Sequence, residues 1–171
     1  EFRRVLFRSL WAEFGMSYPM LGWLGTMITV QLTRLVARTF FMRAKPTVDA
    51  ADRWGRIAVL LTAAAGVCWG ASVLLFFDPT APMNLVAMTM TATGIASGGL
   101  AVLSALPAAY LAYLLTHIPP VIFVLAVTGE FVNLVFAACF VFFIVVLVTA
   151  VRAMSATLEE SLRLRFERME I

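Results

Sequence analysis

Charged side chains are almost absent from more than half of the chain. Between Ile57 and Val151 the only charged residues are Asp78 and Glu130, and each adjoins the proline or glycine of a predicted turn. Soluble domains carry about a quarter charged residues, whereas each helical crossing of a bilayer needs about 20 consecutive apolar residues. The scarcity of charge therefore excludes a soluble enzyme and predicts an all-α fold, a polytopic transmembrane helical bundle with about five crossings.

Cysteine, histidine and paired carboxylates are also too sparse to build a reactive centre. The two cysteines, Cys68 and Cys139, lie inside apolar stretches with no CxxC or Cys/His spacing, which argues against a disulfide or a metal site. The polar segments contain no nucleophile with a base and no phosphate-binding glycine loop. We therefore expect no catalytic, metal or cofactor site in this chain. The basic residues flank apolar stretches instead of alternating with aromatics, so we also expect no nucleic-acid partner.

Five apolar stretches are each long enough to cross a bilayer. They lie at about residues 16–37, 57–77, 83–103, 107–127 and 131–151. Residues 16–151 are thus the expected transmembrane domain, in contact with the lipid bilayer. Residues 1–15 have neither an initiator methionine nor a signal-peptide core, and we interpret them as a non-native or cut edge. Residues 40–56 are expected to be a short polar loop, and the alternative for residues 48–54 is an amphipathic turn that lies on the membrane surface with Trp54 in the interface. Tyr18 and Trp23 are expected to be interface aromatics.

The distribution of basic residues predicts the orientation of the chain. Six basic residues lie between Arg34 and Arg56 and four follow Val151, whereas the turns at Asp78 and Glu130 have none. The positive-inside rule places both basic segments in the cytoplasm. Three arginines near the N-terminus conflict with a five-helix topology, and a sixth helix preceding this sequence would remove the conflict.

Small residues four positions apart predict where helices approach each other. Gly66 and Gly70 share one face of the second stretch, and Gly94 and Gly98 share one face of the third. Such stripes allow close van der Waals packing between helices in lipid. We therefore expect the second and third helices to pack against each other as a hairpin through these four glycines.

The fourth stretch contains the most polar interruption within any span. His117 precedes Pro119 and Pro120, which remove two backbone donors and are expected to kink the helix and free the carbonyls of Leu115 and Thr116. An ionisable group inside a membrane suggests a functional contact, and the alternative is a neutral imidazole that bonds to a freed carbonyl. The groups that we place nearest to a candidate ligand pocket are Trp69, Tyr110, Tyr113 and His117.

The fifth stretch continues without a helix breaker into a charged segment. There, Glu159/Arg163 and Arg163/Glu167 are i,i+4 pairs on a polar face. Apolar residues recur on another face, at Val151 and Met154 and then at the signalling-helix positions Leu158, Leu162 and Met169. Residues 152–171 are thus expected to begin a cytoplasmic linker helix or coiled coil, through which the chain forms a homodimer.

Several segments occur together in an order that resembles a known group of membrane sensors. They are Cys68-Trp69-Gly70-Ala71-Ser72, Gly94 to Gly99, Leu106-Pro107-Ala108-Ala109-Tyr110, Ile118-Pro119-Pro120 and Glu160-Ser161-Leu162-Arg163-Leu164-Arg165-Phe166-Glu167. This order is similar to the N-terminal multi-helix membrane sensor regions of bacterial GGDEF diguanylate cyclases and of sensor or hybrid histidine kinases of two-component systems. The resemblance implies a sensory input module in the bacterial inner membrane, with a cytoplasmic C-terminus. Its last helix would pass a signal from an unknown small-molecule or membrane stimulus to a cytoplasmic output domain.

The resemblance carries over neither ligand residues nor enzymatic activity, because this chain contains no catalytic or phosphoacceptor domain. Two other classes stay open. A fragment of a multi-helix small-solute transporter also has short loops, glycine stripes and a proline-broken helix, although no internal repeat relates the two halves here. A membrane anchor that only localises and dimerises its output domain is the second alternative, but one or two helices suffice for anchoring.

Overall fold

The computed structural model describes residues 18–44, 47–78 and 81–169, and all regular structure in them is helical. The described residues form five helices: α2 (Tyr18–Ala44), α3 (Val48–Phe76), α4 (Pro82–Leu103), α5 (Pro107–Val127) and α6 (Phe131–Met169). Each contains a stretch long and apolar enough to cross a membrane. The predicted fold class, an all-α multi-pass membrane protein, is confirmed. The segment 1–15 lies outside the described residues.

The first two helices are longer than the sequence predicted. α2 continues to Ala44 and α3 begins at Val48, so the expected loop at residues 40–56 is mostly helical. A helix can continue beyond the bilayer because its backbone hydrogen bonds are internal, and α3 stays helical even through Gly55. Trp54 packs edge-on against Phe41 with ring centroids 5.8 Å apart, which joins the extended ends of the two helices. The polar-loop prediction for this segment is therefore wrong.

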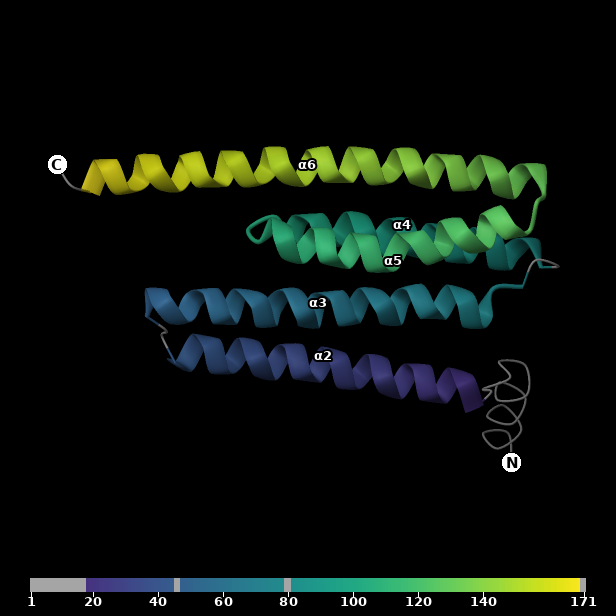
Figure 1. Cartoon of the computed structure of the whole chain (residues 1–171), viewed down its shortest axis with the longest axis horizontal. Coiled ribbons are helices and arrows are strands. Elements are labelled where there is room, and N and C mark those ends of the chain that lie inside the picture. The colour runs from purple at the N-terminus through teal and green to yellow at the C-terminus, as the bar shows by residue number, and fades with distance from the viewer. Residues whose placement is uncertain (1–17, 45–46, 79–80, 170–171) are drawn as a thin grey trace, which may run out of the picture.

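α5 is the central helix of the bundle. Figure 1 shows α3 between α2 and α5, α6 along the other side of α5, and α4 behind α5. The most extensive contact joins α3 to α5, followed by those of α5 with α6 and of α2 with α3. α3 and α5 run in the same direction, because α4 returns across the bundle between them. The main interface thus joins two helices that are not neighbours in the sequence.

The apolar core follows one face of α5. Side chains three or four positions apart on this helix are almost completely buried, namely Tyr110, Leu114, Ile118, Val121 and Leu125. They pack in one cluster with α4 and α6, which contribute Ala92, Ala96, Ala137, Phe140, Leu147 and Val151. The core therefore fixes α5 on two sides, while α3 covers a third.

Short turns with defined hydrogen bonds connect the helices. Pro107 begins α5 in its first turn, where no backbone donor is needed. Gly129 has a φ of 68°, a left-handed conformation that favours glycine, and it closes the turn between α5 and α6. Asn84 bridges the connection between α3 and α4: its Oδ1 accepts from the Asp78 amide at 3.2 Å, and its Nδ2 donates to the Phe76 carbonyl at 3.1 Å.

Charged helix ends gather at one end of the bundle. In Figure 1 the connected ends of α2 and α3 and the C-terminal part of α6 project on the same side, beyond the turn between α4 and α5. The projecting helix ends carry Arg43, Arg53, Arg163 and Arg165. The turn between α5 and α6, with Glu130, lies at the opposite end. The two basic segments that the sequence assigned to one side of the membrane therefore lie on one side of the fold.

Candidate functional site

α3 and α5 approach each other most closely at two glycines of α3. A Cβ atom on Gly70 would lie 2.7 Å from the carbonyl oxygen of Thr116 and 2.9 Å from Pro120 Cγ. On Gly66 it would overlap the Thr116 hydroxyl and lie 2.7 Å from the carbonyl oxygen of Tyr113. Real Cβ contacts are essentially never shorter than 3.0 Å. Glycine is therefore the residue that fits this contact without moving a helix.

Thr116 and Pro120 shape the α5 side of the contact. The Thr116 hydroxyl donates a hydrogen bond of 3.2 Å to the Ala63 carbonyl on α3, shared with carbonyls of its own helix. Pro120 has no N–H for the Thr116 carbonyl, which faces Gly70 instead, where a weak Cα–H···O contact is available. α5 stays helical through Pro119 and Pro120. The close approach of α3 thus covers a backbone group that the prolines leave free.

The predicted hairpin between α3 and α4 is wrong. A Cβ placed on Gly94 or Gly98 of α4 would meet no atom of another described helix within 4 Å, and both glycines are exposed. α3 makes its extensive contacts with α5 and α2. The physical reason lies in α5, because its Thr116 hydroxyl and carbonyl meet the surface that Gly66 and Gly70 leave open.

Three of the predicted pocket residues come together beside this contact. The His117 ring centroid lies 5.3 Å from that of Tyr113 and 6.4 Å from that of Trp69. Tyr113 and His117 are buried, with 5% and 1% of their surface exposed. Tyr113 OH and His117 Nδ1 have no hydrogen-bond partner among the described residues. Buried polar atoms are rarely left unpaired, so a bound molecule with its own polar atoms would gain hydrogen bonds here. A freed carbonyl does not satisfy Nδ1.

The other members of the predicted set lie elsewhere on α5. Tyr110 is fully buried, and its hydroxyl donates a 3.0 Å hydrogen bond to the Ala96 carbonyl, which ties α5 to α4. Pro119 is exposed on the outside of the bundle, whereas Pro120 packs against α3. We therefore define the buried polar cluster as the buried Tyr113 and His117 of α5 together with the partly buried Trp69 of α3.

Trp23 joins this region, a role that the sequence interpretation missed. Its indole Nε1 donates a 2.7 Å hydrogen bond to the Cys68 carbonyl of α3. Its ring packs edge-on against Trp69 and Phe76, with centroids 5.6 and 5.8 Å apart. The position of Trp23, five residues inside a helix that begins at Tyr18, is the available signal, because an indole N–H within an apolar helix needs an acceptor.

The C-terminal part of α6 carries an open apolar stripe. Within the bundle, α6 buries one face at Asn133, Ala137, Phe140, Leu147, Val151 and Ser155. The same three-and-four spacing continues to Leu158 and Leu162, which are 39% and 45% exposed. Arg163 pairs with Glu167 at 2.9 Å on the polar face, as predicted. The Met169 side chain lies outside the described residues. The face that packs on the bundle thus continues as an uncovered stripe beyond it.

The helix interfaces differ in how they are held. Hydrogen bonds join α2 to α3 through Trp23, α3 to α5 through Thr116, and α4 to α5 through Tyr110. Within the part of the chain that the structure describes, no hydrogen bond joins α6 to another helix. At the adjacent turn, Asn133 Nδ2 donates to the Thr128 hydroxyl at 2.8 Å. α6 is therefore held along its length by apolar packing.

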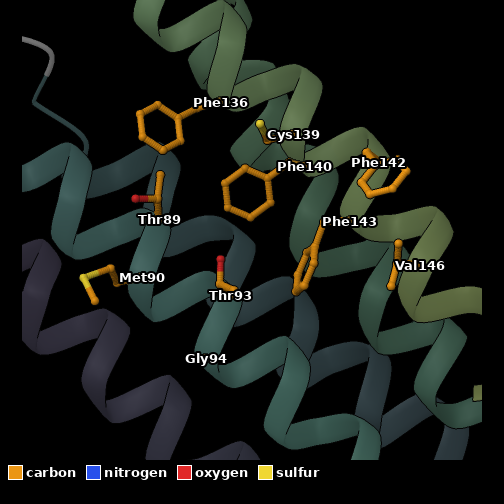
Figure 2. A pocket seen from close by; sticks show the side chains of 10 residues that line it. All are labelled: Thr89, Met90, Thr93, Gly94, Phe136, Cys139, Phe140, Phe142, Phe143 and Val146. Atoms are coloured by element: carbon orange, nitrogen blue, oxygen red, sulfur yellow. The ribbon is translucent and has the colours of Figure 1, made fainter. Parts of the chain in front are cut away.

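An open groove of about 660 Å³ runs between α4 and α6. It is lined by Thr89, Met90, Thr93, Gly94, Phe136, Cys139, Phe140, Phe142, Phe143 and Val146. Figure 2 shows the rings of Phe136, Phe140 and Phe143 reaching from α6 toward the turns of α4 that carry Thr89 and Thr93. The groove was not predicted, because its walls belong to α4 and α6, and the sequence alone does not indicate how these two helices lie relative to each other.

Fold and side chains together define a multi-pass helical membrane protein with a buried polar cluster and a lateral groove. In the described ranges, no group of three or more His, Cys, Asp or Glu residues is placed to hold a metal ion. Comparisons with protein families, with curated proteins and with solved structures find no match to this chain.

Proposed function

We propose that this chain is the membrane-embedded sensory input module of a bacterial signal-transduction protein. In this proposal its last helix passes a signal to a cytoplasmic output domain, a diguanylate cyclase or a histidine kinase. The observation that carries the proposal is α6, an unbroken helix of 39 residues that begins inside the apolar bundle and ends in a charged segment beyond it. A helix of this kind transmits a movement at one end to the other end, because its backbone hydrogen bonds keep it rigid.

The way the helices are joined supports α6 as the moving part. The bonds of Trp23, Thr116 and Tyr110 connect α2, α3, α4 and α5 into one platform. Sliding or rotating α6 against this platform exchanges one apolar contact for another along its length, and among the described residues the side-chain hydrogen bond that it changes is that of Asn133 to Thr128 at the adjacent turn. A stimulus that binds one packing of α6 better than another would shift the population between the two. The buried polar cluster, on the platform, is the candidate place for such a stimulus.

The open stripe at Leu158 and Leu162 supports dimerisation through the same helix. Two copies that pair through these leucines would hold their output domains side by side, and a rotation of α6 would change how the domains face each other. In the proposed orientation the charged end of the bundle faces the cytoplasm, in agreement with the positive-inside rule. The bacterial inner membrane is the proposed location.

A register experiment tests the proposal. A diguanylate cyclase domain is fused after Met169, and one to seven alanines are inserted between Glu160 and Ser161 to rotate it stepwise relative to the bundle. A signalling helix gives cyclase output that rises and falls with the helical period of about 3.6 residues. A control with a flexible Gly/Ser insert of the same length should lose the periodicity. Output that is flat across the alanine series would overturn the proposal and favour the membrane-anchor alternative.

A further inference from the structure

We propose that the groove between α4 and α6 is a binding site for one acyl chain of a bilayer lipid. The binding is independent of signalling, and only its role as a stimulus rests on the proposed function. Both walls of the groove belong to helices that are long and apolar enough to cross the membrane. The groove is therefore open to the hydrocarbon region and not to water. Its volume of about 660 Å³ is within the usual range for sites that bind small molecules.

The chemistry of the walls selects a hydrocarbon over a polar ligand. None of the ten lining residues is charged. The Thr89 hydroxyl already donates within its own helix, with its oxygen 2.8 Å from the Leu85 carbonyl and 3.1 Å from the Val86 carbonyl. The other polar groups are the Thr93 hydroxyl and the Cys139 thiol. A charged or strongly polar molecule would lose its hydration here without gaining matched partners, whereas a methylene chain loses nothing.

The shape of the walls selects a flexible chain over a helix. The closest approach of two helices in lipid is favoured by small residues on their facing surfaces. The α4 wall has such a residue at Gly94, but the α6 wall presents the rings of Phe136, Phe140 and Phe143 (Figure 2). Phe140 and Phe143 pack edge-on with centroids 6.1 Å apart, which gives the wall an uneven surface. A flexible acyl chain follows such an uneven surface more readily than a rigid helix does.

An acyl chain in this groove would lie between a fixed helix and a movable one. α4 is tied to α5 by the hydrogen bond from Tyr110 to Ala96, whereas α6 is held in the bundle by apolar packing. The occupant therefore fills space that α6 would otherwise close by moving toward α4. If the proposed function holds, the order and length of the lipid chains are a second stimulus, beside one that binds at the buried polar cluster.

Photocrosslinking in nanodiscs tests the site directly. The chain is reconstituted in phosphatidylcholine with a diazirine at the middle of one acyl chain, and adducts are mapped by mass spectrometry. We expect adducts per residue at Phe136, Phe143 and Val146 to exceed those at the exposed residues Leu32 and Leu74 by about tenfold, the equivalent of about 1.4 kcal/mol of preference. An even distribution over all lipid-facing residues would overturn the proposal, because the groove would then be ordinary boundary surface.

Two glycines one turn apart provide a matched pair of variants. A side chain on Gly94 would enter the groove, whereas Gly98 lies outside its lining, and neither position has a neighbouring atom within 4 Å of a new Cβ. Gly94→Leu should abolish the tenfold enrichment, and Gly98→Leu should retain it. The same loss in both variants would count against the site. The adduct map of the unaltered chain decides the question should Gly94→Leu fail to fold.

Oxidative crosslinking of Cys139 identifies the competing occupant. A second copy seated symmetrically in the groove would bring two Cys139 thiols together, so efficient disulfide dimers in nanodiscs that each hold two copies would overturn the lipid proposal. Crosslinking no more efficient than at a cysteine introduced at exposed Val102 supports it. These readouts need no output domain, so a lipid site can be established even where the register experiment refutes signalling.

Discussion

Replacing Gly70 with alanine tests the contact that holds α3 to α5. The new Cβ would lie 2.7 Å from the Thr116 carbonyl oxygen and 2.9 Å from Pro120 Cγ. The first of these is a backbone atom, so the clash is relieved only when the two helices separate. A separation of roughly 0.7 Å restores an ordinary contact, and a gap of that size removes about a quarter to a half of the dispersion energy of each neighbouring contact. Overpacking of this kind costs about 1–3 kcal/mol.

Alanine returns at most about 1 kcal/mol of helix propensity relative to glycine. We therefore expect Gly70→Ala to lower the free energy of unfolding by about 1–2 kcal/mol, measured by steric trapping in bicelles or by reversible unfolding in mixed micelles. Gly94→Ala is the matched control, because its Cβ meets open space, and its free energy of unfolding should stay the same or rise by up to about 1 kcal/mol. Equal stabilities of the two variants would refute the close contact.

Three further substitutions separate the roles of individual polar groups. Thr116→Val removes an interhelical hydrogen-bond donor and should lower the free energy of unfolding by about 0.6 kcal/mol. Thr149→Val is its control: it loses hydrogen bonds within an exposed face of α6 and should lower the free energy of unfolding by less in the same assay. Trp23→Phe keeps an aromatic ring but removes the N–H that bonds the Cys68 carbonyl, and we expect a loss of about 1 kcal/mol; an unchanged stability would show that the bond does not hold α2. His117→Leu should alter the output of a cyclase fusion without reducing membrane insertion, and unaltered output would remove His117 from the signalling argument.

The helix boundaries in the middle of the chain were predictable because local chemistry sets them. The span expected at residues 107–127 coincides with α5, since Pro107 suits a first helical turn and Gly129 supplies the positive φ that ends the turn after it. The boundary between α2 and α3 was not predictable from the same rules. Hydropathy falls where the bilayer ends, but the helix does not, so polar residues there were mistaken for a loop.

The choice of helix partner lay outside what the sequence could say. A glycine stripe shows that a helix can be approached closely, but not by which neighbour. Adjacency in the chain favoured α4 as the partner of Gly66 and Gly70, but in the structure both glycines pack against α5. The deciding features are a threonine hydroxyl and a carbonyl freed by Pro120, and both were visible in the sequence as separate observations. The threonine hydroxyl and the freed carbonyl form one contact surface because both lie against α3, which the sequence does not show.

The geometry of α6 explains why a small displacement in the membrane can have a large effect outside it. The buried face through Leu147, Val151 and Ser155 and the open stripe at Leu158 and Leu162 are one continuous line on one rigid helix. A change of register by a single residue turns that line by about 100° and moves it by about 1.5 Å. A smaller rotation of α6 at the α5–α6 interface would therefore turn Leu158 and Leu162 about the helix axis by the same angle as the buried face. Because apolar packing holds α6 in the bundle, the free energy of that rotation depends on how well methyl groups and aromatic rings repack. An acyl chain beside Phe143 would change this free energy directly, because it is one of the groups that must repack.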